Sequence, residues 1–263
     1  MIPPTKNWIF GARPNPAARV RLFCFPFAGG GASTYYPWIS LLAPEIDVYP
    51  VQFPGRENRV KEPPLRRLDG LIQALAQALQ PYFDMPYAFF GHSMGALVSF
   101  ELTRQLRQQG ARLPEHLFLS AYRSPETPSD EPRQALPESA LSDSALMKTL
   151  LELDGTSPEI LANEELRQLL LPILRADFAV CESYQFHAQE PLACPITVLG
   201  GQQDKRVQQA KLETWRKQTS QDFATHMLLG NHLFIRPAQA AVLQIISQAL
   251  VTKTADVPLG ASL

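Results

Sequence analysis

The sequence predicts an α/β fold with a mostly parallel central sheet and helices on both of its faces. Three observations support this prediction. Short apolar runs alternate with longer segments of helical periodicity along most of the 263 residues, a pattern typical of parallel sheets covered on both faces. Hydrophobic residues make up 45% of the chain and charged residues 19%, so it can bury a sizeable core. A strand-poor stretch of about seventy residues interrupts the alternation, which is far longer than an ordinary sheet connection.

Six short apolar segments are predicted to be the strands of this sheet. They are bounded by glycine, proline or polar residues, as strands commonly are. The first ends at a glycine cluster, the second stops at Pro54-Gly55, and the third, YAFFGHS, is a short buried strand. In chain order the predicted strands are 19–27, 47–55, 87–93, 115–121, 194–201 and 222–230.

Five longer segments have the apolar spacing of helices. The clearest is MGALVSFELTRQLRQQG, in which Leu97, Val98, Leu102 and Leu106 follow helical spacing and Gly110 marks a C-terminal stop. In chain order the predicted helices are 33–44, 68–83, 94–110, 206–219 and 237–251.

The strand-poor stretch is interpreted as a helical lid. It runs from about 122 to 191, begins with a Pro/Ser-rich segment and continues with helical patches. We therefore expect a single domain over 1–263 with this lid inserted, and a loose C-terminal tail from about 253. The Leu, Ile and Phe residues at 166–186 either line an apolar chamber under the lid or pack the lid against the core.

Composition argues against several classes of protein. The formal net charge is −1, so no whole-protein field recruits nucleic acid. The sequence contains no apolar run of about 18 residues and no start of signal-peptide type, so no membrane span is predicted. Cys24, Cys181 and Cys194 are odd in number and lack metal-type spacing. They are typical of reduced thiols in a cytoplasmic protein, and we expect no metal site.

The stretch GHSMG, residues 91–95, fits the pattern G-x-S-x-G. A short apolar strand precedes it and an apolar-periodic helix follows, which is the context of a nucleophile elbow. Ser93 is therefore the candidate nucleophile, and the alternative is a plain tight turn. Gly91 and Gly95 have no Cβ, so the helix can pack close to the strand. The backbone N–H of Met94, at the helix start, can then point at a developing oxyanion.

A serine hydroxyl needs a base to become a good nucleophile, and the chain has five histidines. His232 is the candidate because it follows the last predicted strand, in a loop before the last helix. Of the other four, one is expected next to Ser93 with its side chain pointing away, one at the start of a strand, one in the lid and one inside a strand. They are His92, His116, His187 and His226, respectively.

A third residue must orient the imidazole and stabilise it when protonated. Asp204 directly follows the predicted strand 194–201. The alternative is Asp177, on a lid helix, where an acidic residue typically faces solvent or pairs locally. The chain order Ser93, Asp204, His232 is that of α/β-hydrolases, so the predicted fold is the α/β-hydrolase fold.

A second oxyanion donor is expected from the loop after the first strand, FPFAGGGAS. Its three glycines let the backbone approach a ligand closely, although a flexible turn is the simpler alternative. A phosphate-binding loop is disfavoured because no Lys-Ser/Thr pair follows the glycines. We assign the donor to the N–H of Ala28, with Phe27 as the neighbouring alternative.

Six segments together resemble a known family over roughly residues 19–250. They are LFCFPFAGGGAS, FPGRENRVKEPP, FFGHSMGALVSFE, LRADFAVCESYQF, VLGGQQDKRV and GNHLFI. The family is that of the standalone type II thioesterases of nonribosomal peptide and polyketide synthesis. The chain departs from its pattern at Asn231 and Leu233, where the family often has glycine and phenylalanine, and His232 stays in place.

This resemblance implies hydrolysis of acyl thioesters on the phosphopantetheine arm of acyl or peptidyl carrier domains. We expect no cofactor beyond the arm that the substrate carries, no nucleic-acid or membrane partner, and a monomer. A chain-releasing medium-chain acyl-carrier-protein thioesterase is a nearby alternative. A general carboxylesterase and a catalytically silent binding module with the same fold are further ones.

The basic stretch GRENRVKEPPLRR has two interpretations. Carrier domains tend to be acidic, so Arg59 and Lys61 are candidates for a docking surface. A solvated loop is the favoured interpretation for most of these charges.

Overall fold

The structure, a computed structural model, describes residues 8–127, 137–152 and 163–254. All six predicted strands are present and form one parallel sheet in the order β2-β1-β3-β4-β5-β6. The strands are β1 (Val20–Phe25), β2 (Ile46–Pro50), β3 (Tyr87–His92), β4 (His116–Ser120), β5 (Ile196–Gly201) and β6 (Phe223–Leu228).

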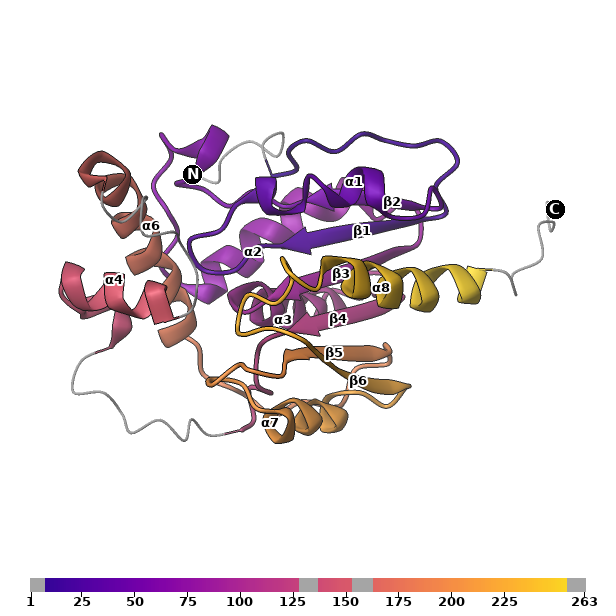
Figure 1. Ribbon diagram of the computed structural model, residues 1–263. Helices are drawn as coiled ribbons and strands as arrows, with labels where there is room; N and C mark the ends of the chain where they lie inside the picture. Colours follow the sequence, from indigo (N-terminus) through magenta and orange to yellow (C-terminus); the bar gives the residue numbers. More distant parts are fainter. Residues whose placement is uncertain (1–7, 128–136, 153–162, 255–263) are drawn as a thin grey trace.

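Helices cover both faces of the sheet, as the alternating pattern predicted (Figure 1). One face buries α2 (Leu68–Leu79), α3 (Met94–Gln108) and α7 (Gln209–Glu213) against a core that includes Phe23 and Phe89. The other face buries α1 (Trp38–Leu41) and α8 (Gln239–Thr254) against a core that includes Leu22, Cys24 and Phe90. Because successive residues of a strand point to opposite faces, β1 and β3 supply side chains to both cores.

The strand register brings the sequence motifs together at one edge of the sheet. Phe25, the last residue of β1, pairs with Gly91, and His92 pairs with Ser120. The loop after β1 therefore starts beside the GHSMG turn. Since the carboxyl ends of parallel strands meet at one edge, the segments that follow β5 and β6 arrive at the same place.

Two predicted helices are divided. The segment 33–44 forms a 3₁₀ turn and α1, with Pro37 as the N-cap residue of α1. The segment 206–219 forms α7 followed by a 3₁₀ turn, where the Trp215 side chain is fully buried and its Nε1–H donates to the Tyr122 carbonyl at 2.7 Å. The 3₁₀ turns are η2 (Ala32–Tyr35), η3 (Glu57–Arg59), η4 (Gln80–Tyr82), η5 (Glu138–Ala140) and η6 (Thr214–Gln218).

Two helices between β4 and β5 lie at one end of the sheet (Figure 1). They are α4 (Asp143–Glu152) and α6 (Glu164–Glu182), and we call them the cap. Asn163 caps α6 through a 3.1 Å bond from the Leu166 N–H to its side-chain oxygen. A small separate core joins the two helices, and its buried members are Leu146, Leu150, Leu174 and Phe178.

Parts of the expected lid and tail lie outside the described residues. These parts are 128–136 and 153–162 of the lid and 255–263 of the tail. Helix α8 continues to Thr254, just past the expected tail start. The lid limits and the single-domain division therefore stay predictions. Within the described ranges, no helix is both long and apolar enough to cross a bilayer.

Candidate active site

Ser93 occupies a strained turn between β3 and α3. Its φ of 53° and ψ of −120° are unusual for a residue with a Cβ, and such a conformation costs about 1–3 kcal/mol. Two backbone hydrogen bonds hold the turn: the Ser93 N–H donates to the Ser120 carbonyl at 2.7 Å, and the Ala96 N–H donates to the Ser93 carbonyl at 2.8 Å. Strand β4 and helix α3 thus impose the turn that presents the hydroxyl.

The two glycines of the motif are required by close backbone packing. A Cβ at Gly91 would lie 2.1 Å from the Gly95 carbonyl oxygen, and a Cβ at Gly95 would lie 2.1 Å from the Phe25 carbonyl oxygen. The first turn of α3 therefore rests directly on β3 and on the end of β1. This contact places the helix start beside the loop that leaves β1.

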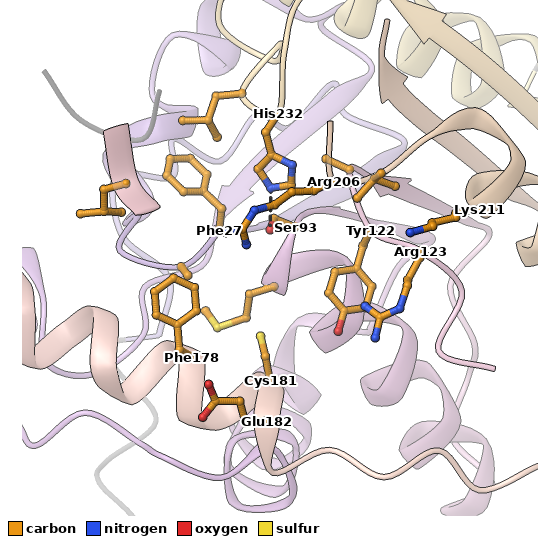
Figure 2. Close-up of a pocket in the computed structure, with 16 residues that line it drawn as sticks. Phe27, Ser93, Tyr122, Arg123, Phe178, Cys181, Glu182, Arg206, Lys211 and His232 are labelled. Carbon is orange, nitrogen blue, oxygen red and sulfur yellow. Dashed lines mark hydrogen bonds between the residues drawn. The ribbon is translucent and has the colours of Figure 1, made fainter. Parts of the chain in front are cut away.

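The three predicted triad side chains meet at the carboxyl edge of the sheet. His232 Nε2 lies 3.0 Å from Ser93 Oγ, and His232 Nδ1 lies 2.8 Å from Asp204 Oδ2. Asp204 follows β5 and His232 follows β6. Figure 2 shows the imidazole beside the Ser93 hydroxyl. The geometry is that of a nucleophile, a general base and an orienting carboxylate.

Asp204 is held as an ionised, oriented acceptor. It is 6% exposed, and the N–H groups of Arg206 and Val207 donate to its Oδ1 at 2.8 and 3.2 Å, which leaves Oδ2 for His232. Burial by itself would raise the pKa of Asp204. The hydrogen bond and charge of His232, with the two backbone donors, outweigh burial and lower that pKa below 3.8.

The other four histidines lie where the sequence placed them. His92 is buried, and its Nδ1 lies 2.8 Å from Ser120 Oγ, away from the Ser93 hydroxyl. Burial, followed by the charge of nearby His232, holds the pKa of His92 well below 6.5. The remaining three are buried at the start of β4, exposed after α6 and half-buried in β6. They are His116, His187 and His226, respectively.

The two predicted oxyanion donors, Ala28 and Met94, line the same cavity as Ser93. Neither of their N–H groups donates to an acceptor in the part of the chain that the structure describes. Unpaired main-chain donors beside a nucleophile suit a developing oxyanion. The choice of Ala28 over its neighbour Phe27 stays a prediction. We call residues 26–31 the oxyanion loop.

The cavity at Ser93, which we call the Ser93 pocket, has a volume of about 330 Å³. Figure 2 shows the aromatic residues Phe27 and Phe178 to one side of Ser93 and the basic residues Arg123 and Lys211 to the other, with Glu182 near Phe178 and Arg206 beside Ser93. Phe178 comes from α6, as expected for a lid residue lining a chamber. Leu166 and Leu169, at the start of the same helix, are instead exposed.

Asp177 is neither part of the triad nor a solvent-facing residue, which corrects the expectation for it. It is 2% exposed and forms two hydrogen bonds with the Arg56 guanidinium, at 2.6 and 2.7 Å. Its Oδ2 also accepts the Gly29 N–H at 2.8 Å. Arg56 is 121 residues away in the chain, so no local pattern around Asp177 could have indicated this partner.

The basic stretch is only partly a solvated loop. Lys61, Arg66 and Arg67 are exposed, but Arg56 and Arg59 are buried. Arg59 lies over the Trp8 ring with its guanidinium carbon 4.3 Å from the ring centre, and it pairs with Glu62. A docking role for Arg59 is therefore wrong, because its charge is already covered and paired.

Comparisons with known proteins agree on one family. Residues 20–250 match the family model of the thioesterase domain. The gramicidin S biosynthesis protein GrsT of Aneurinibacillus migulanus is 42% identical over 244 residues, covering 93% of this chain and 94% of that protein. Linear gramicidin dehydrogenase LgrE of Brevibacillus parabrevis is 46% identical over 247 residues, covering 93% and 92%.

Solved structures point the same way. The RedJ thioesterase from the prodiginine biosynthetic pathway of Streptomyces coelicolor superposes with a TM-score of 0.83 and 36% identity, covering 90% of this chain and 88% of that one. The word dehydrogenase belongs to the name of LgrE, whereas the matched family model and the RedJ structure both name a thioesterase.

Proposed function

This chain belongs to the thioesterase family and is a thioester hydrolase, and we propose that its substrates are acyl groups held on the phosphopantetheine arm of carrier domains. In this proposal it is a type II thioesterase that frees misprimed or stalled acyl groups from a nonribosomal peptide or polyketide synthase. The observation that carries the proposal is the hydrogen-bonded Ser93–His232–Asp204 chain, which opens into a pocket with aromatic residues to one side of Ser93 and basic residues to the other.

The acylation half of the reaction follows from the positions of these groups. His232 Nε2 takes the Ser93 proton as Oγ attacks the thioester carbonyl carbon. The carbonyl oxygen becomes an oxyanion that the N–H groups of Ala28 and Met94 stabilise, each such donor being worth about 10²–10³ in rate. The C–S bond then breaks, and His232 returns its proton to the departing thiolate, leaving an acyl ester on Ser93.

Deacylation repeats the same steps with water as the nucleophile. His232 takes a proton from water, whose oxygen attacks the acyl ester, and the oxyanion is again held by the two backbone donors. Collapse of this intermediate releases the carboxylic acid and restores the Ser93 hydroxyl. Asp204 keeps the imidazole in the tautomer that both halves require.

The two sides of the Ser93 pocket fit the two ends of such a substrate. Leu150 and Phe178 from the cap, with Phe27, provide an apolar surface for an acyl chain. Arg123 and Lys211 line the other side, where the phosphate of a phosphopantetheine arm would be attracted. A general carboxylesterase has no use for a basic wall beside its nucleophile.

GrsT and the RedJ thioesterase are named for gramicidin S and prodiginine biosynthesis, which supports a carrier-bearing synthase as the partner. We propose that the protein works in the cytoplasm as a monomer and needs no cofactor other than the arm of its substrate.

The test is hydrolysis of a panel of acyl groups loaded on a carrier domain, compared with small oxygen esters. We expect carrier-bound thioesters to be preferred, and Ser93→Ala to lower turnover by roughly 10⁶. Near-normal turnover by Ser93→Ala would remove Ser93 from the mechanism. Faster hydrolysis of oxygen esters would favour a carboxylesterase. Failure of an organophosphonate to label Ser93, together with no turnover of any substrate, would favour a binding module.

A further inference from the structure

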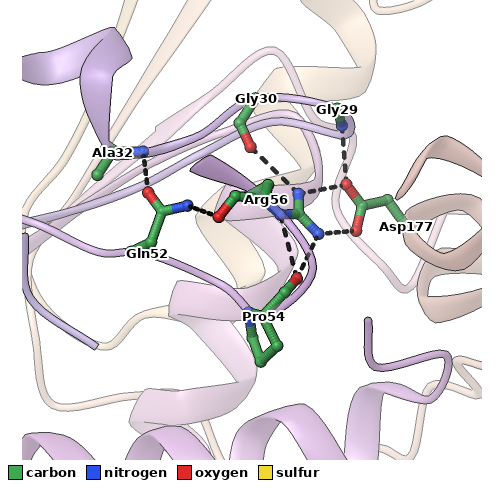
Figure 3. Close-up of polar contacts among 7 residues, drawn as sticks. All are labelled: Gly29, Gly30, Ala32, Gln52, Pro54, Arg56 and Asp177. Carbon is green, nitrogen blue, oxygen red and sulfur yellow. Dashed lines mark hydrogen bonds and ion pairs between the residues drawn. The ribbon is translucent and has the colours of Figure 1, made fainter. Parts of the chain in front are cut away.

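A buried ion pair fastens the oxyanion loop to the cap. Arg56, in the loop after β2, binds Asp177 of α6 through both guanidinium Nη atoms, at 2.6 and 2.7 Å, and their side chains are 4% and 2% exposed. The same two residues hold the oxyanion loop. The Gly29 N–H donates to Asp177 Oδ2 at 2.8 Å, and Arg56 Nη1 donates to the Gly30 carbonyl at 3.1 Å (Figure 3).

Further hydrogen bonds within the loop after β2 hold the Arg56 side chain in place. Its Nε and Nη2 atoms donate to the Pro54 carbonyl, both at 3.4 Å. The Arg56 carbonyl accepts from Gln52 Nε2 at 3.0 Å, and Gln52 Oε1 accepts the Ala32 N–H at 2.7 Å. Every nitrogen of the guanidinium thus has an acceptor, so the planar group has one defined position.

Stability alone is a weak reason for this arrangement. Removing two charges from water costs several kcal/mol per ion, and replacing a buried ion pair by apolar residues of similar size is often neutral or stabilising. What the pair supplies here is position, because its hydrogen bonds end on Gly29 and Gly30, the two residues directly after Ala28. The bonds come from the loop after β2 on one side and from the cap on the other.

We propose that Arg56 and Asp177 are positioning residues that set the oxyanion loop, so that cap helix α6 helps to place the Ala28 N–H. This inference rests on the proposed serine hydrolase site. It means that α6 is part of the catalytic scaffold as well as a cover over the pocket. A displacement of α6 at Asp177 would either break a desolvated ion pair or carry the oxyanion loop with it.

The decisive variant removes both charges at once. In Arg56→Met/Asp177→Leu no buried charge is left unpaired, so the protein is expected to fold, with a loss of about 1–3 kcal/mol for each main-chain group of Gly29 and Gly30 that loses its partner. The matched control is Arg104→Met/Glu101→Leu, which removes another mostly buried pair, 4% and 17% exposed with a 2.6 Å contact. Both residues belong to α3 and line a pocket separate from the Ser93 pocket.

Two readouts separate positioning from folding. One is the hydrolysis of a short-chain acyl thioester of N-acetylcysteamine, and the other is inhibition by a short alkylboronic acid, which bonds Ser93 Oγ and places an oxygen where the oxyanion forms. We expect the Arg56/Asp177 double variant to lose about 10- to 100-fold in kcat, with KM changed less than about two-fold. The boronate Ki should rise by a similar factor, and the control should keep both values.

A double variant whose kcat and boronate Ki stay within about two-fold of the control would overturn the inference. If that variant fails to fold, Arg56→Lys keeps the charge but loses the two-pronged geometry, and the same two outcomes apply to it. Both probes are small and report on Ser93 and the oxyanion loop alone. A wild type that cleaved them but ignored carrier-bound thioesters would refute the proposed function and leave this inference standing.

Discussion

A single methyl group at Gly95 tests whether backbone packing at the elbow sets the active site. In Gly95→Ala the new Cβ would lie 2.1 Å from the Phe25 carbonyl oxygen, 2.7 Å from the Phe25 carbonyl carbon and 2.9 Å from the Pro26 carbonyl oxygen. All three are main-chain atoms, so no side chain can rotate away. Since ordinary contacts of this kind begin near 3.4 Å, α3 and the end of β1 must separate by roughly 1 Å.

The cost follows from that separation. Overpacking of this kind destabilises by about 1–3 kcal/mol, and 1 kcal/mol shifts Tm by about 2–4 °C in a protein near this size. We therefore expect Tm to fall by roughly 2–12 °C. Phe25 and Pro26 lead directly to Ala28, and misplacing a catalytic group by about 1 Å can cost on the order of 10²-fold in rate. We expect kcat to fall by about that factor.

Gly70 provides a matched control because the same substitution should have the opposite effect there. It lies in α2, and a Cβ at Gly70 would meet no heavy atom within 4 Å. Gly70→Ala should stabilise the helix by about 0.5–1 kcal/mol and leave turnover unchanged. The assay is a thermal melt of each variant, followed by acyl-thioester hydrolysis well below Tm. Wild-type Tm and turnover in Gly95→Ala would refute the packing argument.

Two further predictions concern the basic wall of the pocket and the buried histidine of the elbow. Lys211→Ala or Arg123→Ala should raise KM about five-fold for an acyl phosphopantetheine thioester, since a half-exposed ion pair is worth about 1 kcal/mol. KM for the phosphate-free N-acetylcysteamine thioester should not change, and an equal rise for both substrates would contradict this. Because the pKa of His92 is lowered in the folded protein, its imidazole takes up a proton below about pH 6.5 only in the unfolded chain. The free energy of unfolding should therefore decrease as the pH is lowered below that value, by up to about 1.4 kcal/mol per pH unit. In urea unfolding, His92→Gln should lose less stability than the wild type when the pH is lowered from about 7.5 to about 5.5. The loss that remains in the variant should come partly from half-buried His226, whose pKa is also lowered. A loss equal to that of the wild type would refute the role given to His92.

The amino-acid sequence by itself determined the order and type of the main elements and picked out three side chains that the fold brings into contact, Ser93, Asp204 and His232. Alternation of apolar runs with helical periodicity identified every strand of the sheet. G-x-S-x-G between a strand and a helix located Ser93. Asp204 and His232 could be chosen because each follows a strand, and the carboxyl ends of parallel strands converge at one edge. These inferences worked because each rests on local patterns and on one general property of parallel sheets.

Only the tertiary structure decided which charged side chains are buried and which groups they contact. Asp177 looked like a residue on a solvent-facing helix, and Arg56 looked like one of several loop cations. Their contact spans 121 residues and places both beside Gly29. No periodicity or motif encodes such a contact, because it depends on where the cap settles over the sheet. The physical reason is that a charge is worth burying only where a partner and hydrogen bonds satisfy it, and those partners are set by the packing of distant segments.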